Sequence, residues 1–456
     1  MIRDKVDIVI GGAGVAGIAA AEALSARLPD QRILLVDKLA PFTLTSANSG
    51  ELYRNWWLDG RMAGWMQASI ERMEAIAAEC GTRFSMNRRG YAFVYTTHEG
   101  ELEARSSVER WGSFGLGPVR VHEGPDASSY VLARPEGFAN EPDGVDLLLD
   151  PSLIRSRFPY LTGAARAVIH ARRGGWLDAH GFGMRLLELA RARGVEVLRA
   201  EIADVSTDAR GVRGVELTSD DGRRTVETRC FVDAAGPFLA DIARMVGLEL
   251  PVVTVLHQLV VMPDPHGVVP RDAPYTILME PQELLWSDEE RAWLAEEGLE
   301  HLTEPMPGAL HLRPDGPSDS TWIRLGWPYH RAPAPARWTP DFPSEFPEVV
   351  VRGAGRLCPG MARYGETMPP RVSVFGGYYC KTRENLPLVG PTEVAGFYLL
   401  GALSGYGLMA ACAAADALTG WVAAAPLPGS EYFSTARYDD PEFVSSPAGP
   451  AAAGEL

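Results

Sequence analysis

Cysteine is scarce in this 456-residue chain, and its few copies show no pattern of a disulfide framework or a metal site. The five cysteines are an odd number, and none of them belongs to a C-x-x-C pair. A disulfide-stapled fold and a zinc site are therefore not expected, and we predict no metal ion. The same scarcity makes a reducing cytoplasm the expected compartment.

Long apolar runs and an excess of positive charge are also absent. No stretch of 18 or more apolar residues occurs, so we expect no membrane-spanning helix. The first predicted strand begins at about residue 6, which leaves no room for a signal peptide. The chain has 43 Lys and Arg against 59 Asp and Glu, and this net charge of -16 argues against nucleic acid or an anionic membrane as the main partner.

The chain opens on a strand, a glycine turn, a helix and a second strand. Gly12, Gly14 and Gly17 form a G-x-G-x-x-G directly after the first apolar strand. In such a turn the first glycine permits the bend, the second lets backbone approach a pyrophosphate, and the third lets the helix pack on the strand. The second strand ends at Asp37, twenty residues past Gly17, where a carboxylate accepts hydrogen bonds from a ribose. The complete unit predicts a dinucleotide site rather than a glycine-rich structural turn.

Hydrophobic periodicity and capping residues predict further elements. The stretch 60–79 is typical of an amphipathic helix, and Asp178 is the predicted N-cap of a helix that ends near Arg193. Ser287 and Glu290 form a capping box for a short helix within 287–298. We also predict strands at 89–97 and 166–176, a hairpin turn at 220–222, a proline-rich connecting loop at 330–348 and a final strand, glycine turn and alanine-rich helix within 396–422, while 115–150 has no clear assignment.

Two other stretches carry small residues suited to ligand contact. Within residues 41–57, two threonines, two serines, an asparagine and a glycine precede an aromatic and basic segment, which favours either a loop lining a polar ligand or an ordinary turn before the next helix. Residues 232–236 are predicted to form the end of an apolar strand, followed by small residues. Ligands of parallel sheets bind at such strand ends.

Four stretches together resemble the flavin-dependent amine and amino-acid oxidases and dehydrogenases, including D-amino-acid oxidase, glycine oxidase and monomeric sarcosine oxidase. They are the opening glycine unit, the loop TSANSGE, the strand end VDAAGPFLADIA, and the C-terminal ENLPLVGP with GALSGYGLM. The resemblance covers nearly the whole chain in order, and it is loose only over 260–350.

The resemblance implies FAD as the cofactor. The opening glycines would lie at its pyrophosphate and Asp37 at its ribose, while Gly405 to Met409 would face the pyrimidine edge of the flavin, where amides at a helix N-terminus stabilise its anionic reduced form. The residues it implies at FAD are Gly12, Gly14, Val15, Ala16, Gly17, Asp37, Lys38, Ser46, Ala47, Ser49, Gly50, Ile202, Ala234, Ala235, Gly236, Gly405, Tyr406, Gly407, Leu408 and Met409.

The resemblance also implies the fold class: α/β, or α+β overall. Family members have a Rossmann-like FAD-binding domain assembled from several chain segments, with an interleaved substrate domain built on a mixed β-sheet. We assign 1–85, 151–247 and 351–425 to the FAD-binding domain, 86–150 and 248–350 to the substrate-binding domain, and 426–456 to a peripheral tail.

The chain lacks cations that the family uses to bind a substrate carboxylate. The position of the arginine of glycine-oxidase-like members is Tyr379, and that of the lysine of sarcosine-oxidase-like members is Met409. An arginine is a strong carboxylate clamp, so a small free amino acid is a less secure substrate. The candidate substitutes are Arg54, Arg313, Arg324, Lys381 and Arg383, each of which is more often a solvated surface charge.

A covalent bond to the flavin is not expected either. Sarcosine-oxidase-like members attach flavin through a cysteine at the position of Gly377, and Cys380 lies at an odd offset from it. Successive side chains of a strand point to opposite faces, so Cys380 is expected on the other face. The resemblance thus implies non-covalent FAD.

The chemistry implied is hydride transfer from a carbon that bears nitrogen to flavin N5, with the protein supplying orientation and desolvation. Such a step needs no strong base if the amine arrives neutral. The first candidate for an active-site residue is Tyr379, followed by Tyr53, Arg54 and His257, although a lone histidine is more often structural. The acceptor is O2 or an electron carrier. The helix within 287–298 is either a surface excursion or a lid over a bulky substrate.

Two alternatives remain. An aromatic-ring monooxygenase shares the opening unit, but its members carry a G-D-A-x-H stretch that this chain lacks. A non-catalytic flavin-binding module is disfavoured by glycine loops at both ends of the chain, which serve the ring as well as the phosphates.

Overall fold

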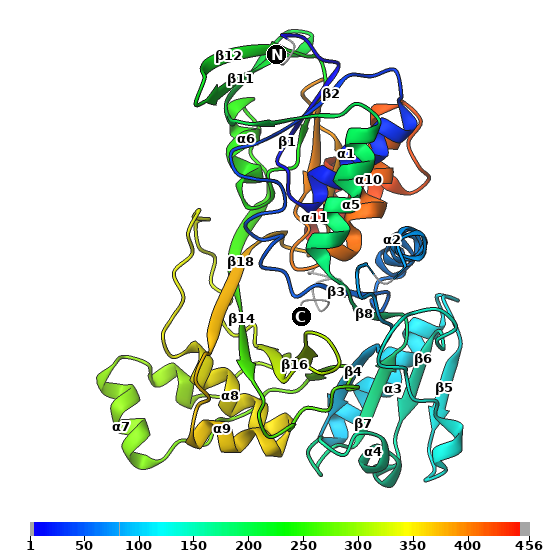
Figure 1. Cartoon of the computed structure of the whole chain (residues 1–456), viewed down its shortest axis with the longest axis vertical. Helices are drawn as coiled ribbons and strands as arrows, with labels where there is room; N and C mark the ends of the chain where they lie inside the picture. The colour runs from blue at the N-terminus through cyan, green and yellow to red at the C-terminus, as the bar shows by residue number, and fades with distance from the viewer. Residues whose placement is uncertain (1–3, 82, 447–456) are drawn as a thin grey trace.

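The computed structural model describes residues 4–81 and 83–446, and within them the strands form four sheets. Figure 1 shows a part built on the six-stranded sheet above a part built on the nine-stranded sheet, with the long strands β14 (Val252–Pro263) and β18 (Ser373–Thr382) running between them. The mixed α/β architecture of the prediction is confirmed.

The six-stranded sheet carries the opening unit at its centre. Its order is β19-β20-β13-β1-β2-β9, with β19 antiparallel to β20 and the other neighbours parallel. The strands are β1 (Ile8–Gly11), β2 (Ile33–Asp37), β9 (Glu196–Arg199), β13 (Phe231–Asp233), β19 (Leu388–Pro391) and β20 (Phe397–Gly401). Every residue of β1 is buried, as expected of a parallel strand covered on both faces.

Helices cover one face of this sheet and a small sheet covers the other. Helix α1 (Val15–Arg27) packs against both α5 (Ala179–Ala192) and α10 (Gly407–Val422), and the side chains of Ile8 and Ile10 join their core. Val9 points the other way, into a core shared with α6 and the antiparallel sheet β10-β11-β12. These elements are α6 (Leu239–Met245), β10 (Glu201–Asp208), β11 (Gly211–Ser219) and β12 (Gly222–Glu227).

The nine-stranded sheet is mixed. Its order is β18-β14-β17-β16-β15-β4-β7-β6-β5, with parallel pairs only at β15/β4 and β5/β6 among the described strands. Its other strands are β4 (Tyr91–Tyr95), β5 (Val119–His122), β6 (Val145–Leu148), β7 (Ala167–Ala171), β15 (Tyr275–Leu278), β16 (Leu310–Asp315) and β17 (Trp322–Gly326).

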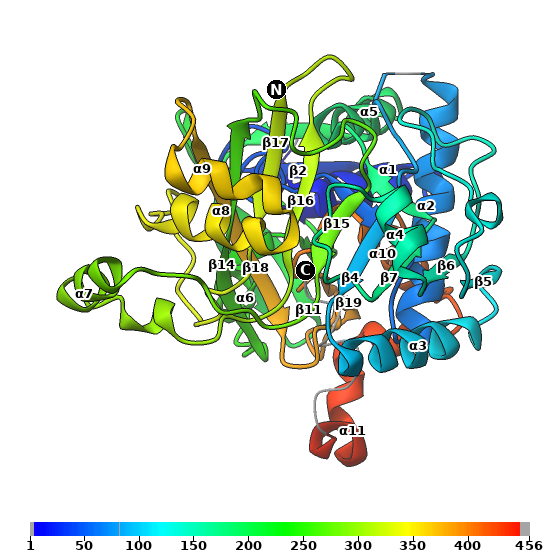
Figure 2. The same ribbon diagram turned by 90° about the horizontal axis from the view of Figure 1, so that it is seen from below.

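Both faces of this sheet are also covered. Helices α4 (Pro151–Arg157), α8 (Phe346–Leu357) and α9 (Ala362–Glu366) share a core with one face, and α3 (His98–Gly112) shares a core with the other. Helix α7 (Asp288–Glu296) stands out from the body of the molecule in Figures 1 and 2. The remaining elements are α2 (Gly60–Glu79), α11 (Pro441–Ser445), the two-stranded sheet β3 (Leu52–Arg54) with β8 (Gly174–Trp176), and the short 3-10 helices η1 (Ala127–Ser129), η2 (Gly236–Phe238), η3 (Glu300–Thr303), η4 (Pro359–Met361), η5 (Ser430–Phe433) and η6 (Thr435–Asp439).

Several local predictions are confirmed. Helix α2 has the predicted bounds, the side chain of Asp178 accepts a hydrogen bond from Gly181 N to cap α5, and the capping box of Ser287 and Glu290 is present. Ser219 pairs with Gly222 across the predicted hairpin turn. The stretch without a clear assignment, 115–150, contains β5, η1 and β6.

The chain crosses between the two large sheets at other points than the expected boundaries. Strands β7 and β18 belong to the nine-stranded sheet, and α8 and α9 pack on it, although 151–247 and 351–425 were expected with the first. The part of the tail within 426–446 also differs from the expected peripheral segment, because Phe433 is buried against Trp65 and the buried Arg437 pairs with Glu384 at 2.7 Å. Residues 447–456 lie outside the described residues. No described helix has the length and apolarity needed to cross a membrane.

Candidate active site

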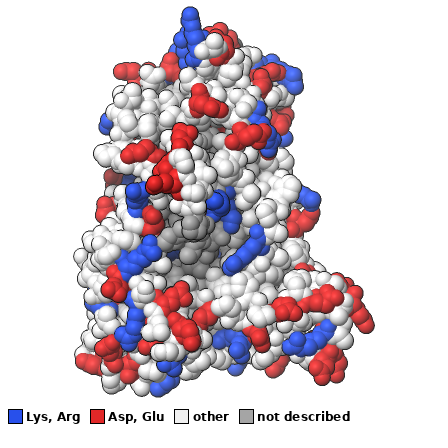
Figure 3. Space-filling model, turned by 180° about the vertical axis from the view of Figure 1, so that it is seen from behind, with Lys and Arg blue, Asp and Glu red and all other residues white. Residues whose placement is uncertain are grey.

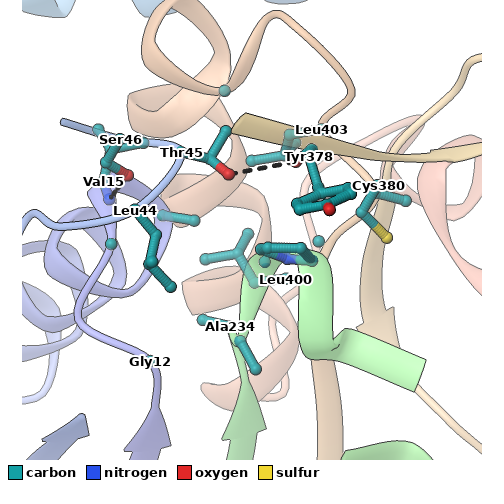
Figure 4. A pocket seen from close by; sticks show the side chains of 18 of the residues that line it. Gly12, Val15, Leu44, Thr45, Ser46, Ala234, Tyr378, Cys380, Leu400 and Leu403 are labelled. Atoms are coloured by element: carbon teal, nitrogen blue, oxygen red, sulfur yellow. Dashed lines mark hydrogen bonds between the residues drawn. The ribbon is translucent and has the colours of Figure 1, made fainter. Parts of the chain in front are cut away.

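A first cavity opens at the carboxyl edge of the six-stranded sheet, where β1, β2 and β13 end (Figure 4). The polar loop after β2 and the strand β18 close it from the other side. Its lining residues are Gly12, Gly14, Val15, Ala16, Asp37, Thr43, Leu44, Thr45, Ser46, Ala234, Ala235, Gly236, Pro237, Tyr378, Cys380, Leu400, Gly401, Ala402, Leu403, Ser404 and Gly407. Its empty volume, with the solvent at its mouth included, is about 710 Å³.

The three glycines of the opening turn have different structural roles. Gly12 has a φ of +105°, and a Cβ there would overlap the carbonyl oxygen of Ala234. A Cβ on Gly17 would overlap the carbonyl oxygen of Gly12, so this glycine lets α1 pack on the turn. Gly14 has an ordinary φ of -71°, and a Cβ there would meet only the Ser46 hydroxyl, at 3.1 Å. The backbone conformation at Gly14 therefore does not require a glycine, but the missing side chain leaves room in front of the start of α1.

The N-terminus of α1 faces the first cavity. Its N-cap, Gly14, makes no side-chain capping hydrogen bond, and Val15 N donates to Ser46 Oγ at 3.0 Å. The first amides of a helix have no partner within the helix and suit a phosphate group, and the Ser46 hydroxyl adds a further polar group there. The residues present thus fit the pyrophosphate of a dinucleotide.

Asp37 is held in place at the end of β2. Its carboxylate accepts hydrogen bonds from Ala13 N at 2.7 Å and Leu39 N at 2.8 Å, and burial raises its pKa. It lines the first cavity, as expected of a residue that binds a ribose. Its neighbour Lys38 instead forms an exposed ion pair with Glu201 at 3.0 Å.

Asp233, at the end of β13, is a buried acid that sequence reasoning missed. Its Oδ1 accepts a hydrogen bond from Ala235 N at 3.1 Å, and its Oδ2 has no hydrogen-bond partner among the described residues. Burial raises the pKa of Asp233 well above its usual range, because a charge there would be poorly solvated. Burial therefore favours the protonated, neutral form of this carboxyl, which directly precedes Ala234 and Ala235 of the first cavity.

This neutral acid should make the stability of the protein fall as pH rises. A carboxyl whose pKa is higher in the folded state keeps its proton there after the unfolded chain has lost it, so stability declines by about 1.4 kcal/mol per pH unit from about pH 4 up to the folded pKa. We expect Asp233→Asn to remove this decline, measured by urea unfolding at several pH values. The highly exposed Asp341→Asn is the matched control, and parallel curves for wild type and Asp233→Asn would contradict the assignment.

Strand β18 separates the first cavity from a second one. Tyr378 and Cys380 line the first cavity, whereas Gly377 and Tyr379 line the second, as the alternation of a strand requires. Thr45 Oγ1 donates to Tyr378 O at 3.2 Å (Figure 4), and a Cβ on Gly377 would come within 2.9 Å of Thr45 Cα. The polar loop therefore packs directly on Gly377, and Cys380 lies on the face opposite to Gly377 and Tyr379, as predicted.

The second cavity lies between the two large sheets and is lined mainly by aromatic rings and polar groups. Its lining residues are Asn48, Ser49, Gly50, Leu52, Arg54, Tyr91, His257, Gln258, Leu259, Tyr275, His311, Trp327, Pro328, Gly377, Tyr379, Gly405 and Met409. The ring of Tyr379 stacks on His257 with centroids 3.9 Å apart, and a Cβ on Gly405 would come within 2.5 Å of Tyr379 Cε2. Gly405 thus leaves the space that the Tyr379 ring occupies.

Arg54 carries the permanent charge of the second cavity. No Asp, Glu, Lys or other Arg is found among its described lining residues. The guanidinium lies 5.0 Å from the ring centroid of Trp57 and 5.2 Å from that of Tyr91, and its Nε donates to Trp56 O at 3.2 Å. Burial lowers the pKa of His257 to about 3 and that of His311 to about 4, so both rings are neutral near pH 7. The cavity therefore presents one positive charge to a ligand.

The other cation candidates are engaged elsewhere. Arg313 and Arg324 form ion pairs with both Glu51 and Asp315, at 2.9 to 3.2 Å. The exposed Arg383 donates to Val444 O and Ser446 O, and Lys381 follows Cys380 on β18 without lining the second cavity. Among the five cations considered, only Arg54 lines this cavity.

Several predicted site residues line neither cavity. Tyr53 is fully buried and its hydroxyl donates to Asn87 O at 2.6 Å, which does not support a catalytic role. Tyr406 is buried, with its hydroxyl donating to Asn385 O at 2.9 Å and its ring edge-on to Trp57. Ile202 packs beside Gly11 and lines neither cavity. The other predicted residues that line neither cavity are Gly17, Lys38, Ala47, Leu408 and all residues of 287–298. Helix α7 therefore lies on the surface, away from both cavities.

Comparison with known proteins decides the family. A family model described as FAD dependent oxidoreductase, the DAO family, matches residues 7–421. The chain belongs to this family. The predicted resemblance, enzyme class and cofactor, FAD, are thereby confirmed.

Relatives of this oxidoreductase are distant. The subunit HcnC of hydrogen cyanide synthase from Pseudomonas aeruginosa is 26% identical over 276 residues, which cover 56% of this chain and 63% of the relative. Human mitochondrial dimethylglycine dehydrogenase is 23% identical over 308 residues, which cover 67% of this chain and 32% of the relative. The match thus spans less than two thirds of either curated relative.

Solved structures share the fold over nearly the whole chain. L-proline dehydrogenase from P. horikoshii is similar with a TM-score of 0.73 at 18% identity, over 96% of this chain and 99% of that one. Glycine oxidase from Geobacillus kaustophilus has a TM-score of 0.69 at 16% identity, over 94% and 98%. Iminodiacetate oxidase from Chelativorans sp. BNC1 has a TM-score of 0.66 at 17% identity, over 94% and 98%. These likenesses confirm the predicted fold class.

Proposed function

We propose that this FAD-dependent oxidoreductase oxidises a carbon–nitrogen bond of an amino acid whose carboxylate binds to Arg54 in the second cavity. The observation that carries the proposal is the single permanent charge, Arg54, in a cavity otherwise lined by aromatic and neutral groups. Proline, glycine and iminodiacetate, which the names of the structural relatives give as their substrates, are all amines that carry a carboxylate. The absence of Asp and Glu among the described lining residues disfavours a substrate with a second ammonium group.

Bound FAD supplies the acceptor for a hydride, at N5 of its ring. The proposed cofactor contacts are Gly12, Gly14, Val15, Ala16 and Asp37 in the opening unit, Ser46, Ser49 and Gly50 in the polar loop, Ala234 to Gly236 after β13, and Gly405, Gly407 and Met409 in the last glycine turn. FAD is held without a covalent bond in this proposal, since Gly377 offers no side chain for attachment.

The chain's own residues orient the substrate and exclude water. Arg54 is fixed between two aromatic rings, so little side-chain entropy is lost when it binds a carboxylate. Tyr379, which His257 backs by stacking, forms a wall beside the last glycine turn. Because His257 and His311 have lowered pKa values, they are weak bases, and we expect the amine to react in its neutral form.

We propose O2 or an electron carrier as the final acceptor, and the cytoplasm as the compartment, because all five cysteines are free. Nucleic acid is not a proposed partner. On the face seen in Figure 3, Lys and Arg side chains are interspersed with Asp and Glu rather than gathered in one basic patch, and the surface is hollowed near its middle.

Anaerobic bleaching of the flavin tests the proposal. Purified protein is mixed without oxygen with amines, N-methyl amines, D- and L-amino acids and 2-hydroxy acids, and the visible flavin absorbance is followed before air is admitted. We expect bleaching by at least one amino acid, with rapid recovery in air for an oxidase and slow recovery for a dehydrogenase. Bleaching by NAD(P)H alone would overturn the proposal in favour of a monooxygenase, and no bleaching by any of these reductants would favour a non-catalytic flavin protein.

Removal of the Arg54 charge should act on the carboxylate alone. We expect Arg54→Met to lower kcat/KM for the amino acid by roughly thirtyfold, since a hydrogen bond to a charged group is worth about 2 kcal/mol. The amine that lacks the carboxylate should react equally with both proteins. The matched control is Arg383→Met, because Arg383 is exposed and lines neither cavity. Equal losses for amino acid and amine would show that Arg54 does not bind the carboxylate.

A further inference from the structure

A proline-rich segment of the nine-stranded part reaches back to the six-stranded part. Residues 328–345, here called the strap, connect β17 to α8. In Figure 1 this yellow-green loop rises beside β14 and β18 toward α6. It is tied to β14 through Ala334, whose N donates to Thr254 O at 2.8 Å and whose O accepts from Thr254 Oγ1 at 2.5 Å. The strap is thus a held segment, stiffened by its prolines.

Trp338, four residues past this anchor, contacts two residues of the six-stranded part. Its ring stacks on Phe238 with centroids 4.4 Å apart and planes at 20°. Lys38 Nζ lies 4.9 Å from the centroid of the same ring. The Trp338 side chain is still 42% exposed, so it is not a residue of the hydrophobic core. The contact joins the two parts of the molecule near the surface.

Both residues that Trp338 contacts follow directly on residues that line the first cavity, although neither of them is among its lining residues. Phe238 follows Gly236 and Pro237, which line the cavity after the end of β13. Lys38 follows Asp37, which lines it at the end of β2. Strand β1 lies between β13 and β2 in the sheet, so Phe238 and Lys38 follow the two strands that flank β1, after which the dinucleotide turn begins.

We propose that the strap is a further wall of the FAD site and that Trp338 retains bound FAD by bridging Phe238 and Lys38 across the end of β1. This inference rests on the proposed position of FAD in the first cavity. FAD that has no covalent bond leaves only when the cavity opens. Opening this side breaks an aromatic stack and a cation–π contact, which together slow the release.

Release of FAD from the holoenzyme tests the proposal. We expect Trp338→Ala to release FAD roughly tenfold faster than wild type, because both the stack and the cation–π contact are lost. The rise in free-flavin fluorescence after dilution measures the release rate. Trp338→Phe keeps a ring on Phe238 and should restore most of the retention. The matched control is Trp293→Ala, which removes a tryptophan that is 49% exposed on α7 and should release FAD at the wild-type rate.

The outcomes separate this inference from the proposed function. Equal release rates for wild type and Trp338→Ala would overturn the strap as a wall, while flavin bleaching by amino acids would stand. Thermal unfolding of the apoproteins shows whether Trp338→Ala has lost its fold. If it unfolds early, Phe238→Leu takes its place: faster FAD release from this variant supports the bridge, and a wild-type release rate overturns it.

Discussion

Replacement of Gly14 by valine should weaken FAD binding by about a hundredfold or more while leaving the protein folded. The φ of Gly14 is -71°, which valine adopts, and a Cβ there meets only the hydroxyl of Ser46. The valine methyls would instead occupy the space in front of the first turn of α1, where the pyrophosphate is expected. Two charge-assisted hydrogen bonds lost there are worth roughly 3 kcal/mol or more, a fall in affinity of about a hundredfold or greater.

The measurement is the FAD bound per chain after purification with added FAD, together with the thermal unfolding of the apoprotein. Gly163→Val is the matched control, because Gly163 is exposed and a Cβ there meets nothing within 4 Å. A Gly14→Val protein that binds FAD as tightly as wild type would show that the pyrophosphate lies elsewhere. Gly12 and Gly17 cannot serve in this test, since a side chain at either overlaps backbone.

The dinucleotide unit was predictable because its signals are local. The strand, the three glycines and Asp37 lie within one stretch of sequence. Two of the glycines have a local backbone reason, because Gly12 has a φ of +105° and a Cβ on Gly17 would overlap the carbonyl oxygen of Gly12. The alternation of β18 was equally local, which is why the opposite faces of Tyr379 and Cys380 follow from the sequence.

The second cavity was predictable only in part because it depends on strand neighbours far apart in sequence. Tyr91 and Tyr275 pair across the parallel neighbours β4 and β15, and the ring of His311 on β16 lies 5.1 Å from that of Tyr275. No local pattern marks these residues as neighbours. The candidate cations show the same limit, because only the sheet register reveals that Arg313 faces Arg324.

That register creates a cluster of four charges, which leads to the second large effect. Arg313 and Arg324 stand directly opposite each other on β16 and β17, an arrangement that is destabilising for like charges alone. Asp315 Oδ1 lies 2.9 Å from Arg313 and 3.2 Å from Arg324, and Glu51 Oε2 contacts both arginines at 3.1 and 3.2 Å. The carboxylates therefore hold the two arginines together.

The same cluster positions the polar loop beside the second cavity. Arg324 donates to Ser49 O at 3.0 Å and Arg313 donates to Gly50 O at 3.2 Å, and both loop residues line the cavity. Glu51 itself has a φ of +63°, a left-handed conformation that glutamate seldom adopts without such support. Loss of one carboxylate should thus disturb both stability and the site.

We expect Asp315→Asn to lower the free energy of unfolding by about 3 kcal/mol, since one carboxylate is then left between two facing arginines, one of them fully buried. Urea unfolding near pH 7 measures this loss. Asp341→Asn is the control, because Asp341 and Arg337 form a highly exposed pair whose loss should cost no more than about 1 kcal/mol.

Charge balance, rather than the carboxylate itself, should decide the outcome. The double variant Asp315→Asn with Arg324→Met keeps the Arg313–Glu51 pair at 3.1 Å and removes the facing like charge. It should therefore be more stable than Asp315→Asn alone, although it lacks the Arg324 bond to Ser49 O. If the double variant is the less stable of the two, the cluster acts through the separate contacts of each arginine and not through its balance of charge.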